Sequence, residues 1–216
     1  MRCVSICPTA RMGLGYIPGA FAWNARSHVN SLVTFRSSDS KQRHHRPDTR
    51  PIPSPPSQER YGSLQRQLRV VWGCAVHDVP NSFPNACQYD AVFHQHIATK
   101  LHPRHESAAN LRDAALAWIE THASHPVHGQ TIGEWIVAMG HFNVSEYVRH
   151  MRKRGVRGDA ITLLAMAHVL GATIVLVRDR QSVEEFAPTD AAPRATLVVG
   201  YYPEVHYVGT RPLVGE

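Results

Sequence analysis

Helical and strand patterns follow one another along this chain in separate blocks. Apolar residues recur at helical spacing between Cys87 and Leu170, whereas β-branched runs come last, at 172–177, 195–202 and 205–209. A doubly wound sheet needs strands that alternate with helices, so this order excludes a regular βαβ repeat and predicts an α+β domain. A further short run, LRVVWG at 68–73, predicts a strand ahead of the helical block.

The helical block carries its own start and stop signals. Thr131 and Glu134 have the spacing of a capping box, which predicts that a helix begins there. Ser145 is expected to open the next helix. Asp159 should cap the helix that Gly171 ends, because glycine adopts the left-handed conformation of a helix stop at little cost.

The first 62 residues differ in composition from the rest of the chain. Residues 1–60 hold nine Lys and Arg against three Asp and Glu, a net charge of +6 that equals the formal charge of the whole chain. Residues 36–60 are rich in Ser, Arg and Pro and almost lack apolar side chains, which predicts a disordered linker. We therefore expect a disordered leader and linker over 1–62 and one folded domain over 63–216.

Composition excludes several classes of protein. Hydrophobic residues make up 43% of the chain, enough to form a core, and no apolar run approaches the ~20 residues of a membrane-spanning helix. Four cysteines in 216 residues are too few for a disulfide scaffold, so a reducing, cytoplasmic compartment is expected. Because the net positive charge lies in the leader, the folded domain is not expected to bind nucleic acid.

Two residues stand out as candidates for chemistry. Cys87 follows a turn-forming stretch and begins a predicted helix, where unpaired N–H groups favour the thiolate and can bind an oxyanion. The backbone amides of Asn85, Ala86 and Cys87 are the oxyanion candidates. His206 belongs to a late strand, from which it could act as the base for a cysteine nucleophile.

This arrangement resembles the ovarian-tumour (OTU) family of cysteine proteases, most of which are deubiquitinases. Five segments occur in the family's order over about residues 76–210: the nucleophile segment PNACQYDAVF, the helix NLRDAALAWI, EYVRHM, GVRGDAITLLAMAHVLGATIVLV, and His206-Tyr207. The resemblance implies a small central, mainly antiparallel sheet flanked by helices. It also implies a Cys87–His206 catalytic pair that hydrolyses ubiquitin isopeptide bonds without a cofactor, with ubiquitin or polyubiquitin as partner.

Two positions depart from the family's pattern. Pro84 replaces an aspartate three residues before the nucleophile, and Val208 replaces the Asn or Asp that orients the imidazole. A substitute for that third residue could come from the loop before Cys87, where Asp78, Asn81 and Asn85 are the candidates. The departures leave two alternatives open: a weak or inactive domain that binds ubiquitin or another protein, and a protease that cleaves a polyprotein.

The chain has 15 histidines, several of them closely spaced. The pairs and triplets are His94 and His96, His102 and His105, and His122, His125 and His128. No Cys-x-x-Cys pair accompanies them, whereas structural zinc sites use four ligands in two tight pairs. We therefore expect solvated or helix-surface histidines and no metal site.

Overall fold

The computed structural model describes residues 58–99, 105–178, 182–202 and 206–213. The predicted leader and most of the predicted linker lie outside these residues. Within the described part, no helix combines the length and the apolar character needed to cross a membrane.

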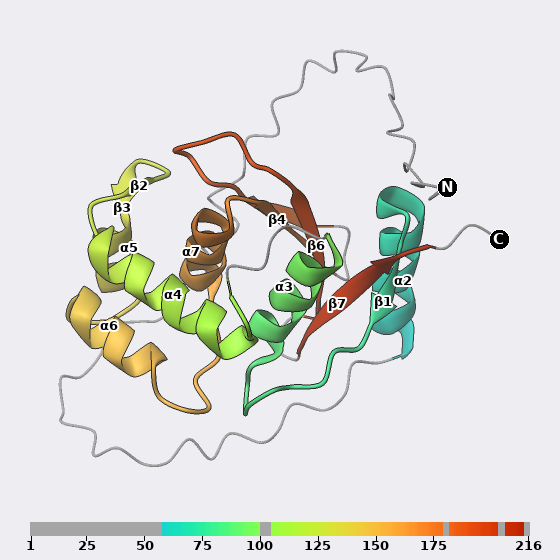
Figure 1. The fold of residues 1–216 in the computed structure, drawn as a ribbon, viewed down its shortest axis with the longest axis horizontal. Coiled ribbons are helices and arrows are strands. Elements are labelled where there is room, and N and C mark those ends of the chain that lie inside the picture. Colours follow the sequence, from blue (N-terminus) through green and yellow to red (C-terminus); the bar gives the residue numbers. More distant parts are fainter. Residues whose placement is uncertain (1–57, 100–104, 179–181, 203–205, 214–216) are drawn as a thin grey trace, which may run out of the picture. The chain divides into compact units, whose positions relative to one another are not determined.

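The centre of the domain is a five-stranded mixed sheet (Figure 1). In spatial order its strands are β1 (Cys74–His77), β7 (His206–Pro212), β6 (Thr196–Tyr202), β4 (Thr173–Arg178) and β5 (Val183–Phe186). The β4–β6 pair is parallel and the other three pairs are antiparallel. This confirms the predicted α+β class and the mainly antiparallel sheet.

Helices cover both faces of the sheet. They are α2 (Gln58–Trp72), α3 (Cys87–Ala98), α4 (Ala108–Thr121), α5 (Ile132–Ala138), α6 (Val144–Met151) and α7 (Ala160–Leu170); a short hairpin of β2 (Pro126–Val127) and β3 (Gln130–Thr131) precedes α5. Alternate residues of β4 enter two separate cores: Ile174 and Leu176 pack with α3, α4 and α7, whereas Val175 and Val177 pack with α2. Accordingly, α2 lies across the sheet from the other helices in Figure 1.

The predicted strand at 68–73 is wrong, because these residues form the end of α2 and the turn after it. Leu64 and Leu68 are one helical turn apart and fully buried against the sheet, while Val70 and Val71 are exposed. The helical period therefore prevails over the local β-branched composition. α2 begins at Gln58, so a helix covers the last five residues, 58–62, of the leader and linker expected to be disordered over 1–62.

The capping signals were more reliable. The capping box of Thr131 and Glu134 is present, and Asp159 caps α7, which ends at Gly171 in the left-handed conformation with φ = 60°. The helix expected to begin at Ser145 begins one residue earlier, at Val144. The reason is that Asn143 caps it, since the Asn143 side chain accepts a hydrogen bond from the Glu146 amide.

Candidate active site

Cys87 is the first residue of α3 and is half-buried. A tight turn precedes it, in which the Ala86 amide donates to the Phe83 carbonyl at 3.1 Å. Asn85 takes a left-handed φ of 60° in this turn. Asparagine is among the residues that best tolerate this backbone conformation. The turn therefore places Cys87 at the start of the helix.

Two sets of hydrogen bonds hold the loop before Cys87. The carboxylate of Asp90, in the first turn of α3, accepts from the Ser82 amide at 2.8 Å and from the Ser82 hydroxyl at 2.6 Å. The Asn85 side-chain amide donates to the Gly155 carbonyl at 2.5 Å. Neither Ser82 nor Asp90 was predicted from the sequence to belong to the site; the only signal for them was the acidic residue in the first helical turn.

A buried amide links the start of α3 to the start of α7. Gln88 donates to the Asp159 carbonyl at 3.0 Å and accepts from the Thr162 hydroxyl at 2.8 Å. A Cβ atom on Gly158 would overlap the Gln88 side chain, so only glycine leaves room for this contact. Gly158 and Asp159 thus hold the start of α3, the helix that begins with the predicted nucleophile.

The sulfur of Cys87 lies against the start of β7. Burial raises the pKa of the Cys87 thiol, while backbone hydrogen bonds from Tyr207 and Gln88 and the positive charge of Arg157 act to lower it. Tyr207 directly follows His206 in β7. The structure therefore brings the predicted nucleophile to the strand that carries the predicted base.

His206 is the first residue of β7 and is partly buried. Burial lowers the pKa of its imidazole; Arg157 lowers it further and Asp78 acts to raise it. A raised thiol pKa and a lowered imidazole pKa both favour the uncharged resting state of such a pair. Arg157, which acts on both groups, was not identified from the sequence.

The three candidates for the third residue lie in different surroundings. Asp78 directly follows β1, the neighbour of β7, and its charge acts on the pKa of His206. Asn81 is exposed in the loop, and the Asn85 side chain is directed to Gly155. Val208 is buried in the cluster formed with α2, where it adds to the core.

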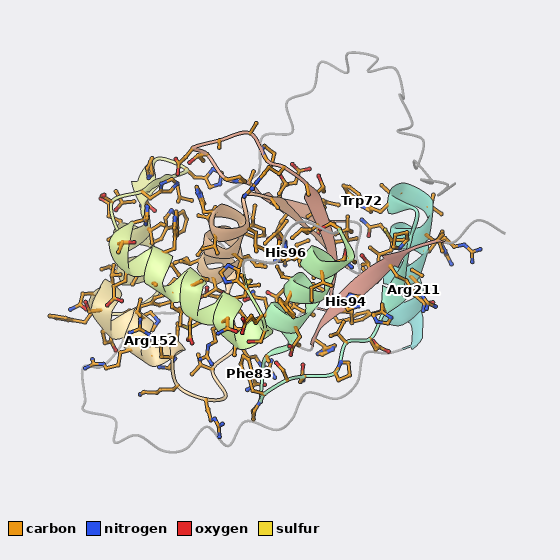
Figure 2. The ribbon with its side chains drawn as sticks, viewed as in Figure 1. Trp72, Phe83, His94, His96, Arg152 and Arg211 are labelled. Atoms are coloured by element: carbon orange, nitrogen blue, oxygen red, sulfur yellow. The ribbon has the colours of Figure 1, made fainter. Side chains whose placement is uncertain are left out.

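Several of the histidines are more buried than expected. His94 stacks on His77 with 4.5 Å between ring centroids, and His96 is 3% exposed; both lie on α3 (Figure 2). Burial lowers the pKa of both imidazoles. The interpretation of these histidines as solvated is therefore wrong for His96.

Potential metal ligands gather away from Cys87 and His206. In the described part of the chain, His125, His168 and Asp190 form a group whose ligand atoms all lie within 4.8 Å of one another.

Comparisons with known proteins agree with this fold. The model of the family described as OTU-like cysteine protease matches residues 86–207. The OTU domain of OTUD1 is similar with a TM-score of 0.50 and 16% identity, over 71% of this chain and 95% of that domain. No curated protein shows significant similarity to the chain.

Viral and bacterial OTU domains are also among the similar structures. The Hazara virus OTU, solved bound to ubiquitin, has a TM-score of 0.43 and 17% identity over 66% of this chain and 83% of that one. An OTU deubiquitinase from Wolbachia pipientis, also bound to ubiquitin, has a TM-score of 0.44 and 11% identity over 65% and 96%. Since the family model spans more than half of the 216 residues, the chain belongs to the OTU-like cysteine protease family.

Proposed function

We propose that this chain is a thiol-dependent deubiquitinase in which Cys87 and His206 form the catalytic pair. The observation that supports this most is the position of the Cys87 sulfur: it lies at the N-terminus of α3 and interacts with the Tyr207 amide, next to His206. Membership of the family supplies the reaction class. The ubiquitin substrate follows from the family resemblance of the sequence motifs.

The proposed reaction begins from the uncharged pair. His206 accepts the thiol proton as the sulfur attacks the carbonyl carbon of the isopeptide bond between the C-terminal glycine of ubiquitin and a lysine. The tetrahedral intermediate collapses, and His206 returns the proton to the departing lysine amine. Water, deprotonated by His206, then hydrolyses the thioester to release the ubiquitin carboxylate and restore the thiol.

The oxyanion would be held by the backbone amides of Cys87 and Asn85. The first-turn amides of a helix have no intrahelical acceptor, which makes the Cys87 N–H suitable. The Ala86 amide is a poorer choice than the sequence suggested, because it donates to Phe83 in the preceding turn. The hydrogen bond from the Asn85 side chain to Gly155 would keep the loop in place as the charge develops.

Asp78 would orient His206 and stabilise its protonated form. Its carboxylate acts to raise the pKa of the imidazole, as expected for the acidic member of a triad. We expect Asp78→Asn to lower kcat/KM by about 10²–10⁴. The acidic limb of the pH profile should move to lower pH, because the asparagine no longer favours the imidazolium. Kinetics on a ubiquitin–fluorophore substrate between pH 5 and 9 would measure both effects, and an unchanged limb would reject this role.

Replacing Arg157 removes a positive charge near His206, whereas replacing Asp78 removes a negative one. Arg157 lowers the pKa of both Cys87 and His206, so Arg157→Gln should move the acidic limb to higher pH. The Arg157 side chain is exposed, so we expect the substitution to leave the fold intact. If the acidic limb moved in the same direction in Asp78→Asn and Arg157→Gln, the opposite effects assigned to these two charges on the His206 pKa would be contradicted.

A ubiquitin probe with a C-terminal electrophile tests the proposed function. The wild-type chain should form one covalent adduct that disappears in Cys87→Ala. Cys74→Ala is the matched control, because Cys74 is also a partly buried free thiol and is hydrogen-bonded to the Trp72 carbonyl. The Cys74 thiol should not react with the probe, so the Cys74→Ala variant should form the same adduct as the wild type. An absent adduct with the wild-type chain, while another OTU enzyme reacts in the same assay, would reject the proposal.

Val208 favours a second candidate function, a domain that binds ubiquitin or another protein without cleaving it. This residue occupies the usual position of the orienting Asn or Asp and is buried against α2 instead. Ubiquitin binding that persists in Cys87→Ala, together with no hydrolysis by the wild-type chain, would select this alternative. Cleavage of a linked polypeptide but not of ubiquitin conjugates would select the polyprotein protease.

A further inference from the structure

Three potential metal ligands meet where three segments of the chain come together. His125 lies in the turn between α4 and β2, His168 in the last turn of α7, and Asp190 in the loop between β5 and β6. Their ligand atoms lie within 4.8 Å of one another. None of these segments belongs to the Cys87 loop or to β7, so the group is separate from the proposed catalytic pair.

The histidine rings are held in place by neighbours. Trp118 of α4 stacks on His168 with 4.4 Å between ring centroids and meets His125 edge-on at 5.3 Å. The Thr189 hydroxyl lies 3.1 Å from Nε2 of His125 and donates to Asp190 at 3.1 Å. Such supporting contacts around ligands orient them and are typical of metal sites.

The two ring nitrogens of His168 have different surroundings. Its side chain is 3% exposed, and Nδ1 lies 3.5 Å from the Asp190 carboxylate. Nε2 is buried and has no hydrogen-bond partner among the described residues. The two nitrogens lie on different edges of the ring, so Nδ1 is the one that faces the ligand group.

We propose that His125, His168 and Asp190 bind a divalent transition-metal ion of the zinc type. Two imidazoles and one carboxylate are a ligand set used for Zn²⁺, with a water molecule in the fourth position. Ligand atoms around tetrahedral zinc are about 3.4 Å apart. The Asp190 side chain is 67% exposed and can rotate inward to close the difference. The ion would tie α7 to the α4–β2 turn and the β5–β6 loop.

Zinc titration of the purified full chain tests this site. In competition with a chromophoric chelator, the wild-type chain should bind one more tight equivalent of zinc than the Asp190→Asn variant binds. The zinc affinity of this site should be at least about 10-fold lower in the variant. His125→Gln should lose the same equivalent. With zinc at about 100 times its Kd, the melting temperature of the wild-type chain should rise by about 5–10 °C.

Matched variants separate this site from general histidine binding. His122 stacks on Trp118, the residue that also stacks on His168, but it lies outside the ligand group. The His122→Gln variant should therefore still bind the zinc equivalent. Cobalt should give the visible absorption of a tetrahedral site in the wild-type chain and in this control only. Equal zinc binding by the wild-type chain, Asp190→Asn and His125→Gln would overturn the proposal, whatever the outcome with the ubiquitin probe.

Discussion

Replacing His206 by alanine is expected to lower kcat/KM for ubiquitin conjugates by about 10⁴. The reason is the state of the resting pair. Burial raises the pKa of the Cys87 thiol and lowers that of the imidazole, so little thiolate is present before the base acts. A cysteine that depends on proton transfer loses nearly all of its reactivity without the base. The rate of hydrolysis of a ubiquitin–fluorophore substrate gives the direct measurement.

The pH profile of the variant distinguishes base catalysis from a structural effect. Residual activity of His206→Ala should rise with pH up to the thiol pKa, because hydroxide then replaces the imidazole as the base. His128→Asn is the matched control: His128 is exposed in the β2–β3 hairpin with φ = 49°, a conformation that asparagine tolerates. It should retain the wild-type rate. A His206→Ala variant within 10-fold of the wild type would contradict the assigned base.

The sequence predicted much of the fold because its capping and periodic signals are local. Thr131 with Glu134 and Asp159 with Gly171 satisfy backbone groups within one helical end, so no distant residue is needed to interpret them.

The strand β5 was missed for the opposite reason. Its buried positions are Glu184 and Phe186, while Val183 is exposed. Glu184 can face inward because it pairs with Arg178 of β4 at 2.6 Å, a contact that the pattern of apolar residues cannot reveal.

The same distinction applies to the site. Cys87 could be predicted from its position before a helix, and its approach to β7 agrees with the expected pair. The contacts that hold the Cys87 loop could not be predicted from the sequence. Asn85 donates a hydrogen bond to Gly155, and Gln88 donates one to Asp159, each across about 70 residues of chain. Arg157 acts on Cys87 in the same way, through space. Such long-range contacts follow from the tertiary fold, which no local spacing encodes.

Asp159→Ala is expected to lower the free energy of unfolding by about 2–4 kcal/mol. The carboxylate of this partly buried residue accepts from the Tyr147 hydroxyl at 2.9 Å and 3.0 Å and caps α7 through the Thr162 amide at 3.0 Å. Alanine would remove the cap and leave the Tyr147 hydroxyl buried without its acceptor. Urea unfolding followed by circular dichroism measures the loss.

A double-mutant cycle with Tyr147→Phe tests whether this contact carries the effect. Phenylalanine removes only the hydroxyl, so the cost of Asp159→Ala should be smaller in the Tyr147→Phe background, with a coupling energy of about 1–2 kcal/mol. Strict additivity would place the effect in the helix cap alone. Asp159→Asn should be milder than Asp159→Ala, because its amide oxygen can still accept from the Thr162 amide.

The pH dependence of stability gives Asp159 a signature that a plain packing defect lacks. Burial raises the pKa of its carboxyl in the folded state, although hydrogen bonds from Thr162, Tyr147 and Ile161 act to lower it. A folded-state pKa above the unfolded value means that folding favours the protonated form. The contribution of Asp159 to stability is therefore greatest below its unfolded pKa of about 3.9 and decreases as pH rises through the folded pKa. Asp159→Asn does not titrate, so the stability advantage of the wild type over this variant should shrink across that window. A difference that is constant or grows with pH would show that hydrogen bonds, and not burial, determine the charge state of Asp159.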